Sequence, residues 1–159
     1  MAFAAPAKAQ NTAAAGTQNP EDKPVVTNQT ALNLESQFDF GKYTMSVPAG
    51  LLQRSGDGQY HAVLPDGRFS MMIMETQGAA KDLKEMVQDA AKSLKLGNGQ
   101  LKKVEADGMD GYMVSERKGQ EVQTLAVLRD GKNTITFFIR EAETLQPLAP
   151  QAVASVKKR

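Results

Sequence analysis

His61 is the only histidine in the chain of 159 residues, and it is the first candidate for acid–base or nucleophilic chemistry. A catalytic histidine needs a nucleophile and an orienting carboxylate within hydrogen-bond reach. Ser46, Ser55 and Ser70 occur in the same part of the sequence, but none lies in a G-x-S-x-G nucleophile elbow. His61 falls in a predicted strand just before a hairpin. We therefore interpret it as a structural histidine and expect no catalytic residue.

Two Asp-Gly pairs in the stretch 107–111 could form a cation-binding loop. Asp107 and Asp110 carry carboxylates, but the stretch lacks the third ligand position and the closing glutamate of an EF-hand. Asp-Gly is a common turn pair, so we interpret both as turns. The sequence has no cysteine, which excludes thiolate metal centres, and no glycine run of the kind that cradles phosphate. We expect no metal and no cofactor.

Methionines are the remaining residues that could do chemistry, and the chain contains eight. Clustered thioethers can bind Cu(I), and Met71, Met72 and Met74 lie close together in the sequence. Consecutive strand residues point to opposite faces, however, so Met71 and Met72 cannot share one metal ion. Methionine is also an adaptable residue on surfaces that bind apolar helices or peptides. Met72 and Met74 are therefore our candidate partner-binding residues, on the condition that their side chains are exposed.

The charge balance argues against nucleic acid as a partner. The chain has 19 Lys and Arg residues and 18 Asp and Glu residues, which gives a net charge of +1. The basic pair at 102–103 and the basic residues at 157–159 are too short and too far apart to form a nucleic-acid patch. No apolar run reaches the roughly 18 residues that a transmembrane helix needs. We expect a protein partner of unknown identity.

The N-terminus has the pattern of an exported protein. Residues 2–10 read AFAAPAKAQ, which is typical of the end of an apolar signal-peptide segment followed by a small-x-small cleavage site before Gln10. An ordinary alanine-rich tail is the alternative interpretation. Residues 11–33 contain few large apolar side chains and cannot bury enough surface to become ordered. We expect a signal-peptide remnant and disordered linker over 1–33, a single α+β domain over 34–159, and a periplasmic or extracellular location.

Apolar and polar residues alternate through most of 34–159, which is the pattern of half-buried strands. Turn signals at 65–67, 107–108 and 130–131 contain Asp-Gly, which is a strong hairpin signal between two such runs. Short connections make consecutive strands antiparallel. The predicted strands lie at 38–40, 43–47, 59–64, 68–75, 101–106, 112–116, 121–128 and 133–140.

Two segments follow the helical period instead. The first, over 82–96, has Asp82 and Glu85 as a capping box and Gly97 as a stop signal. The second precedes the C-terminus, where residues 157–159 are basic and suit the end of a helix. The apolar stripe of this second helix consists of Leu145, Leu148, Ala152, Val153 and Val156.

Two amphipathic helices are most simply buried on opposite faces of one sheet. The predicted fold class is therefore α+β: a curved antiparallel sheet of about 6–8 strands with a helix packed on each face, in an α/β/α sandwich.

This order of elements, together with several short segments, resembles the DcrB-like and PsbP-like superfamily of small α/β/α domains. The resemblance covers about 34–158, and the segments that carry it are 40–48 (FGKYTMSVP), 69–74, 82–86, 111–114 (GYMV), 134–139 and 153–156. Superfamily members include bacterial envelope lipoproteins, extrinsic photosystem subunits, a nuclear factor that binds a small GTPase, and chaperones for the membrane helices of secreted effectors. The resemblance implies a non-catalytic role. It transfers no functional residue, and the chain has no lipobox cysteine.

These observations predict an exported, non-enzymatic interaction or accessory domain of the bacterial cell envelope. The alternative is a chaperone-like domain that binds an apolar helix or peptide of a client protein. Exposed methionine and leucine on one sheet face would favour that alternative, and a sheet fully covered by helices would remove it. An enzyme would need a deep pocket that gathers His61 with two carboxylates.

Overall fold

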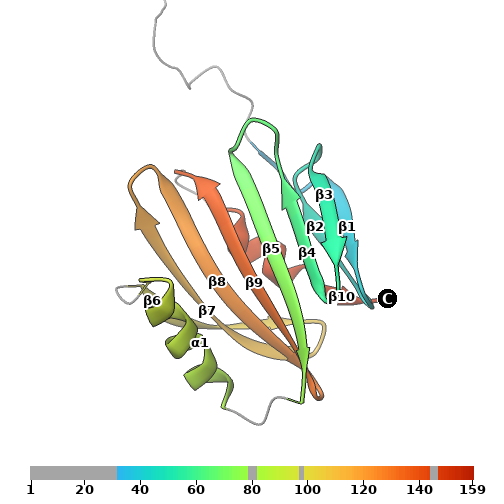
Figure 1. Ribbon diagram of the computed structural model, residues 1–159, viewed down its shortest axis with the longest axis vertical. Coiled ribbons are helices and arrows are strands. Elements are labelled where there is room, and N and C mark those ends of the chain that lie inside the picture. Colours follow the sequence, from blue (N-terminus) through green and yellow to red (C-terminus); the bar gives the residue numbers. More distant parts are fainter. Residues whose placement is uncertain (1–31, 79–81, 97–98, 144–146) are drawn as a thin grey trace, which may run out of the picture. The chain divides into compact units, whose positions relative to one another are not determined.

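The computed structural model describes residues 32–78, 82–96, 99–143 and 147–159 (Figure 1). The predicted signal remnant and nearly all of the predicted linker lie outside these residues, so the domain boundary at 34 stays a prediction. The elements of the described chain, in order, are β1 (Ser36–Phe40), β2 (Tyr43–Val47), β3 (Leu52–Gly56), β4 (Gln59–Val63), β5 (Phe69–Gln77), α1 (Leu83–Ser93), β6 (Gln100–Ala106), β7 (Met109–Lys118), β8 (Glu121–Asp130), β9 (Asn133–Ala142), α2 (Ala149–Ala154) and β10 (Lys157–Lys158).

The strands pair in antiparallel fashion and divide into two sheets. The large sheet has seven strands in the order β3-β4-β5-β9-β8-β7-β6, and the small sheet has three in the order β1-β2-β10. The predicted α+β sandwich, with an antiparallel sheet of 6–8 strands and two helices, is confirmed. The single predicted layer is in fact two sheets, because β1 and β2 pair with each other and with β10 rather than with the strands that follow them.

The inner face of the large sheet packs against the small sheet and α2. Phe40 of β1 meets Phe137 of β9 edge-on, with 6.0 Å between the ring centroids, and it also packs on Tyr60 of β4 at 5.9 Å. Each large apolar side chain buried in this way stabilises the fold by about 1.5–3 kcal/mol. Other buried side chains of this layer are Phe38, Met45, Phe69, Met71, Ile73, Ile135 and Ile139.

A hydrogen-bonded cluster joins the small sheet to the large one. The Tyr43 hydroxyl of β2 donates to Asp130 Oδ2 at 2.8 Å, and the Asn133 amide donates to the Tyr43 oxygen at 2.8 Å and to Glu75 Oε2 at 3.1 Å. Burial raises the pKa of Tyr43 above its ordinary value, and the hydrogen bond from Tyr43 lowers the pKa of Asp130. Because these hydrogen bonds join residues of the two sheets, we assign the cluster a structural role.

Helix α1 covers part of the other face of the large sheet, which we call the outer face. The Asp82 carboxylate accepts the N–H groups of Lys84 (2.8 Å) and Glu85 (3.3 Å), which confirms Asp82 as the N-terminal cap. Leu83, Val87 and Ala91 of the helix pack against a buried cluster whose sheet residues include Val114, Leu125 and Val127.

The end of α1 differs from the prediction of a helix up to 96. The helix stops at Ser93, and Lys95 adopts a left-handed conformation with φ of 61°. The Leu96 N–H then bonds to the Ala91 carbonyl at 2.7 Å, and the Lys95 N–H bonds to the Lys92 carbonyl at 3.1 Å, which is a Schellman ending. This reversal buries Leu96 completely. The predicted stop signal Gly97 lies outside the described residues.

The predicted C-terminal helix is shorter than expected, and the assignment of residues 157–159 to its end is wrong. Helix α2 ends at Ala154, and Lys157 and Lys158 form β10 on the edge of β2. The Ser155 hydroxyl accepts the Ser46 N–H at 2.8 Å, and so holds the chain against β2. Leu145 of the predicted stripe lies outside the described residues. Within the described residues, no helix is long and apolar enough to cross a membrane.

Strand β3 was not predicted, because its sequence LQRSG shows no apolar alternation. All five of its residues are exposed. Among the described strands it pairs with β4 alone, through a hairpin in which Gly56 faces Gln59 across the Asp57-Gly58 turn. That turn was predicted, but the strand before it was not.

A buried carboxylate fixes α2 to the large sheet. Glu141 of β9 is 4% exposed, and it accepts the N–H groups of Leu148 (2.6 Å) and Ala149 (3.1 Å) at the start of α2. These N–H groups have no carbonyl partner inside the helix, so the carboxylate acts as a cap supplied from another element. Burial raises the pKa of Glu141 above its ordinary value, and the two N–H groups oppose that shift.

We predict that Glu141→Ala lowers the free energy of unfolding by about 1–3 kcal/mol, because it leaves two N–H groups at the start of α2 without an acceptor. The folded-state pKa of Glu141 is raised, so the carboxyl contributes most below its unfolded pKa, and the contribution is lost as pH rises through the folded pKa. Urea denaturation of both proteins from acid to neutral pH should therefore show the difference shrinking. Glu105→Ala, at an exposed position of β6, is the control and should change little. A difference that grows with pH would contradict this account.

Candidate functional site

The outer face of the large sheet is only partly covered. Helix α1 lies over β7 and β8, and the same face of β3, β4, β5 and β9 has no helix on it among the described residues (Figure 1). We call this uncovered area the open half-face. The cross-strand registers place on it Leu52, Arg54, His61, Val63, Ser70, Met72, Met74 and Phe138.

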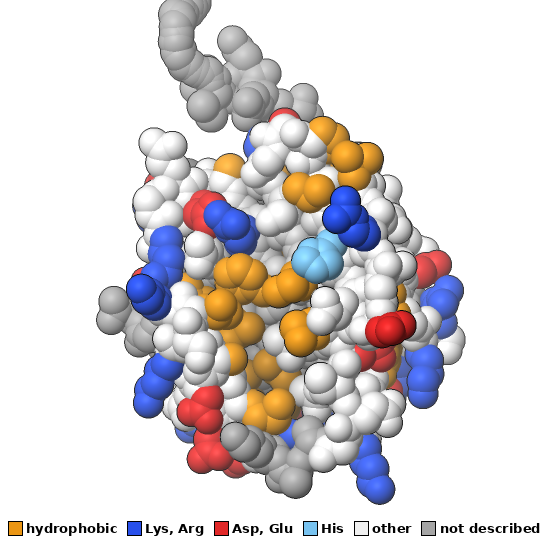
Figure 2. Space-filling view, in the orientation of Figure 1, with side chains coloured by type: hydrophobic (Ala, Val, Ile, Leu, Met, Phe, Trp, Pro, Cys, Tyr) orange, Lys and Arg blue, Asp and Glu red, His pale blue; other side chains and the backbone are white. Residues whose placement is uncertain are grey.

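The open half-face is largely apolar. Leu52 and Val63 face each other across β3 and β4 and are 61% and 41% exposed. Met72 and Phe138 face each other across β5 and β9, and both are half-buried, as is Met74. Figure 2 shows hydrophobic side chains gathered across the middle of this face, with Lys and Arg side chains around them. Apolar patches of this kind on a protein surface commonly mark sites of interaction.

The structure places the predicted partner-binding residues Met72 and Met74 on the open half-face. Met71 points the other way and is 3% exposed, as expected for consecutive strand residues. Leu52, Phe138 and Arg54 belong to the same surface, but sequence reasoning did not single them out. A fully exposed strand and one aromatic residue within an apolar run give no local signal of their place on a shared face.

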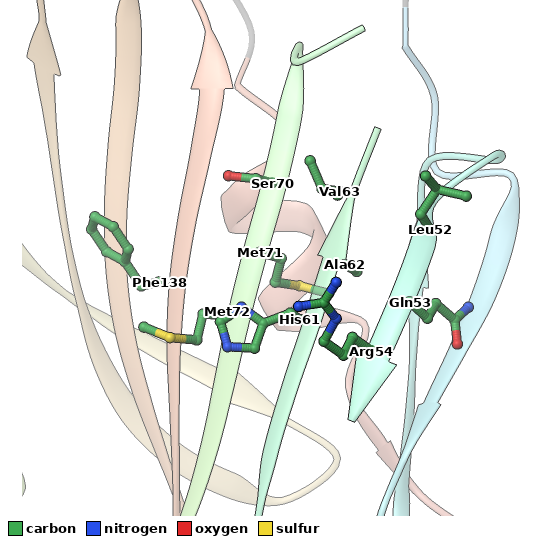
Figure 3. A pocket seen from close by; sticks show the side chains of 10 residues that line it. All are labelled: Leu52, Gln53, Arg54, His61, Ala62, Val63, Ser70, Met71, Met72 and Phe138. Carbon is green, nitrogen blue, oxygen red and sulfur yellow. The ribbon is translucent and has the colours of Figure 1, made fainter. Parts of the chain in front are cut away.

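An open hollow of about 430 Å³ lies within the half-face. Phe138 and Met72 line one side of it, and His61 and Arg54 line the other (Figure 3). The Met72 thioether is directed towards Phe138 and away from His61 (Figure 3).

The charged groups of the half-face are basic or already paired. The Arg140 guanidinium bonds to both carboxylate oxygens of Glu121, at 2.9 and 3.0 Å, and the bond lowers the pKa of Glu121. In the described part of the chain, Arg54 makes no ion pair. Arg54 and His61 are cross-strand partners, so they form a polar rim of the hollow.

The hollow does not assemble the groups of a nucleophilic triad. His61 and Ser70 both line it, but no hydrogen bond is formed between them, and no Asp or Glu is among the lining residues. Ser55 is the cross-strand partner of Tyr60, and Ser46 lies on β2 of the small sheet, where its backbone N–H donates to the Ser155 hydroxyl. Among the described residues, no three His, Cys, Asp or Glu side chains are grouped so that they could hold a metal ion.

Solved structures with the same fold exist at low sequence identity. The solution structure of cyanobacterial PsbP (CyanoP) from Synechocystis matches at a TM-score of 0.57 with 11% identity, over 78% of this chain and 92% of that chain. The crystal structure of the Ran-binding protein Mog1p from Saccharomyces cerevisiae matches at 0.51 with 18% identity, over 80% and 96% of the two chains.

A crystal structure from Bacteroides thetaiotaomicron also matches, at a TM-score of 0.50 with 15% identity. The match covers 74% of this chain, which spans 45% of that longer one. The sequence matches no protein-family model and no curated protein. At these identities the likeness is one of fold. The chain therefore has the fold of these solved structures, which is the fold that the resemblance drawn from its sequence implied.

Proposed function

We propose that this chain is a non-enzymatic protein-interaction domain that binds its partner on the open half-face. The observation that carries the proposal is the unequal coverage of the large sheet: α1 covers one half of the outer face and leaves an apolar surface on the other. Binding a partner there would remove Leu52, Val63 and Phe138 from water, which is favourable at roughly 25 cal/mol per Å² of apolar surface.

The composition of the half-face also suits protein binding. Methionine and phenylalanine are enriched in the buried centres of interfaces, and a flexible thioether can adapt to the partner's shape. Met72, Met74 and Phe138 form such a centre, and Arg54 with His61 forms a polar rim. The fold is compatible with this role, since Mog1p is a Ran-binding protein, although one fold hosts many functions.

We also place the domain outside the cytoplasm, as an accessory domain of the bacterial cell envelope. Support comes from the pattern of residues 2–10, with its small-x-small site before Gln10. Residues 11–33 would then act as a linker between the processed end and the folded domain.

A chaperone-like role, in which the half-face holds an apolar helix or peptide of a client, is the second candidate. The partial exposure of Met72 and Met74 on an uncovered sheet face favours it. The two roles differ in the fate of the partner. A client would aggregate in cells that lack this chain, whereas the partner of an accessory domain would stay folded.

To test the proposal, a photo-crosslinking amino acid is placed at Met72, or at Gln88 on the exposed side of α1 as a matched control. In the cells that produce the protein, we expect a defined protein adduct from position 72 and none from position 88. Phe138→Ser in the same chain should lower the yield of adduct, because it removes the apolar neighbour of position 72.

Equal adducts from both positions would contradict docking on the half-face. Turnover in a hydrolase screen that is abolished by His61→Ala would overturn the non-enzymatic role.

Export predicts a particular N-terminus. N-terminal sequencing of the protein isolated from its native envelope fraction should begin at Gln10, because cleavage follows Ala9. A protein found in the cytoplasm with residues 2–9 still attached would contradict export, and would leave the interaction proposal untouched.

A further inference from the structure

Strand β3 is the open edge of the large sheet. It stands at the end of the strand order, and all five of its residues are exposed. Among the described residues, no strand pairs with its outer side. Such an edge offers a row of backbone N–H and C=O groups with which an extended chain can pair.

The opposite edge strand, β6, has features that hinder pairing with an incoming strand, and β3 lacks them. Strand β6 carries Lys102, Lys103 and Glu105, and it packs against α2. Charged side chains on an edge strand keep foreign strands away from it. Strand β3 reads LQRSG, with one charge and no proline. An incoming strand would therefore pair with β3 rather than with β6.

The β3–β4 hairpin also exposes apolar surface at this edge. Leu52 and Val63, which face each other, are two of the three most exposed large hydrophobic residues in the described chain. A strand added beside β3 would place its own side chain next to Leu52 and shield it from water. Cross-strand apolar pairs contribute roughly 0.2–1 kcal/mol each.

The charge at the edge selects the chemistry of the incoming strand. Arg54 points to the same side as Leu52, and Figure 3 shows its guanidinium beside His61. Arg54 has no ion pair in the described chain, whereas Arg140 on the same face is held by Glu121. An acidic side chain opposite Arg54 would meet an unpaired positive charge, and opposite charges across strands are stabilising.

We infer that β3 accepts an extended segment of a partner protein as an added strand of the large sheet. The alternate side chains of this segment are apolar opposite Leu52 and acidic opposite Arg54. The inference rests on the proposed function and names the partner segment that the same surface takes. A second copy of the chain fits the edge less well, because its own β3 would bring another Arg54 to the same place.

The test begins with random short peptides displayed on phage, selected against the full chain. We expect the enriched peptides to alternate apolar and polar positions and to contain Asp or Glu. Hydrogen exchange should then show slowed exchange of the β3 amides when a selected synthetic peptide is bound, with the β6 amides unchanged. In the free chain the β3 amides that point away from β4 should exchange fast.

Charge reversal tests the role of Arg54. We expect Arg54→Glu to weaken binding of a selected peptide by about three- to tenfold, and a new selection on this variant to enrich Lys or Arg in place of the acid. Lys103→Glu, an equal charge reversal on the exposed edge strand β6, is the matched control and should leave the affinity unchanged.

Several outcomes would overturn the inference. Enriched peptides with helical spacing that bind without protecting β3 would exclude strand addition while keeping the interaction domain. Slow exchange, in the free monomer, of the β3 amides that point away from β4 would show that the chain covers its own edge. A dimer in sedimentation experiments that Ser55→Lys dissociates would identify a second copy as the occupant. No enrichment at all would overturn the inference, and the crosslinking at Met72 would then decide the proposed function separately.

Discussion

The structure depends on a mismatch between the width of the large sheet and the width of α1, the one helix that the described residues place on its outer face. Seven strands spaced about 4.8 Å apart span about 30 Å, whereas one helix is about 10 Å wide with its side chains. Helix α1 therefore covers the outer face of β7 and β8, where it buries the side chains of Val114, Leu125 and Val127. The strands on the other side of the sheet keep an outer surface that the described chain does not bury.

The inner face has the opposite arrangement, and this difference gives the two faces different roles. The small sheet and α2 pack against the inner face, and the Tyr43–Asn133 cluster joins the two sheets there. Glu141 of the large sheet accepts two N–H groups at the start of α2 and so holds this helix in place. The inner face stabilises the fold, and the polar groups named above form hydrogen bonds within the protein. The outer side carries partly exposed apolar residues such as Met72 and Phe138, and Phe138 also packs against the buried cluster beneath α1.

Sequence patterns predicted what depends on local periodicity and turn chemistry. Alternation identified β5, β8 and β9, and Asp82 located the start of α1. The Asp-Gly pairs at 57–58, 66–67, 107–108 and 130–131 located hairpins. The interpretation of Asp110-Gly111 as a turn is wrong, because both residues are paired on both sides within β7. Sequence patterns did not predict features that depend on contacts between residues far apart in the sequence. Strand β3 is exposed on both sides and has no period, β10 exists because β2 offers an edge, and the division into two sheets depends on pairing choices. Met72 and Met74 were found as candidates, but whether a helix covers them depends on where α1 docks, which no local pattern encodes.

The rate at which individual methionines are oxidised by hydrogen peroxide tests the central claim most directly. Oxidation to the sulfoxide requires access to the thioether, and mass spectrometry of the native protein reads each residue separately. If the half-face is open in solution, Met72 and Met74 will oxidise well before Met71, their buried neighbour in the same strand. Equal, slow oxidation of all three would show that the outer surface of β5 is covered, and would contradict the account.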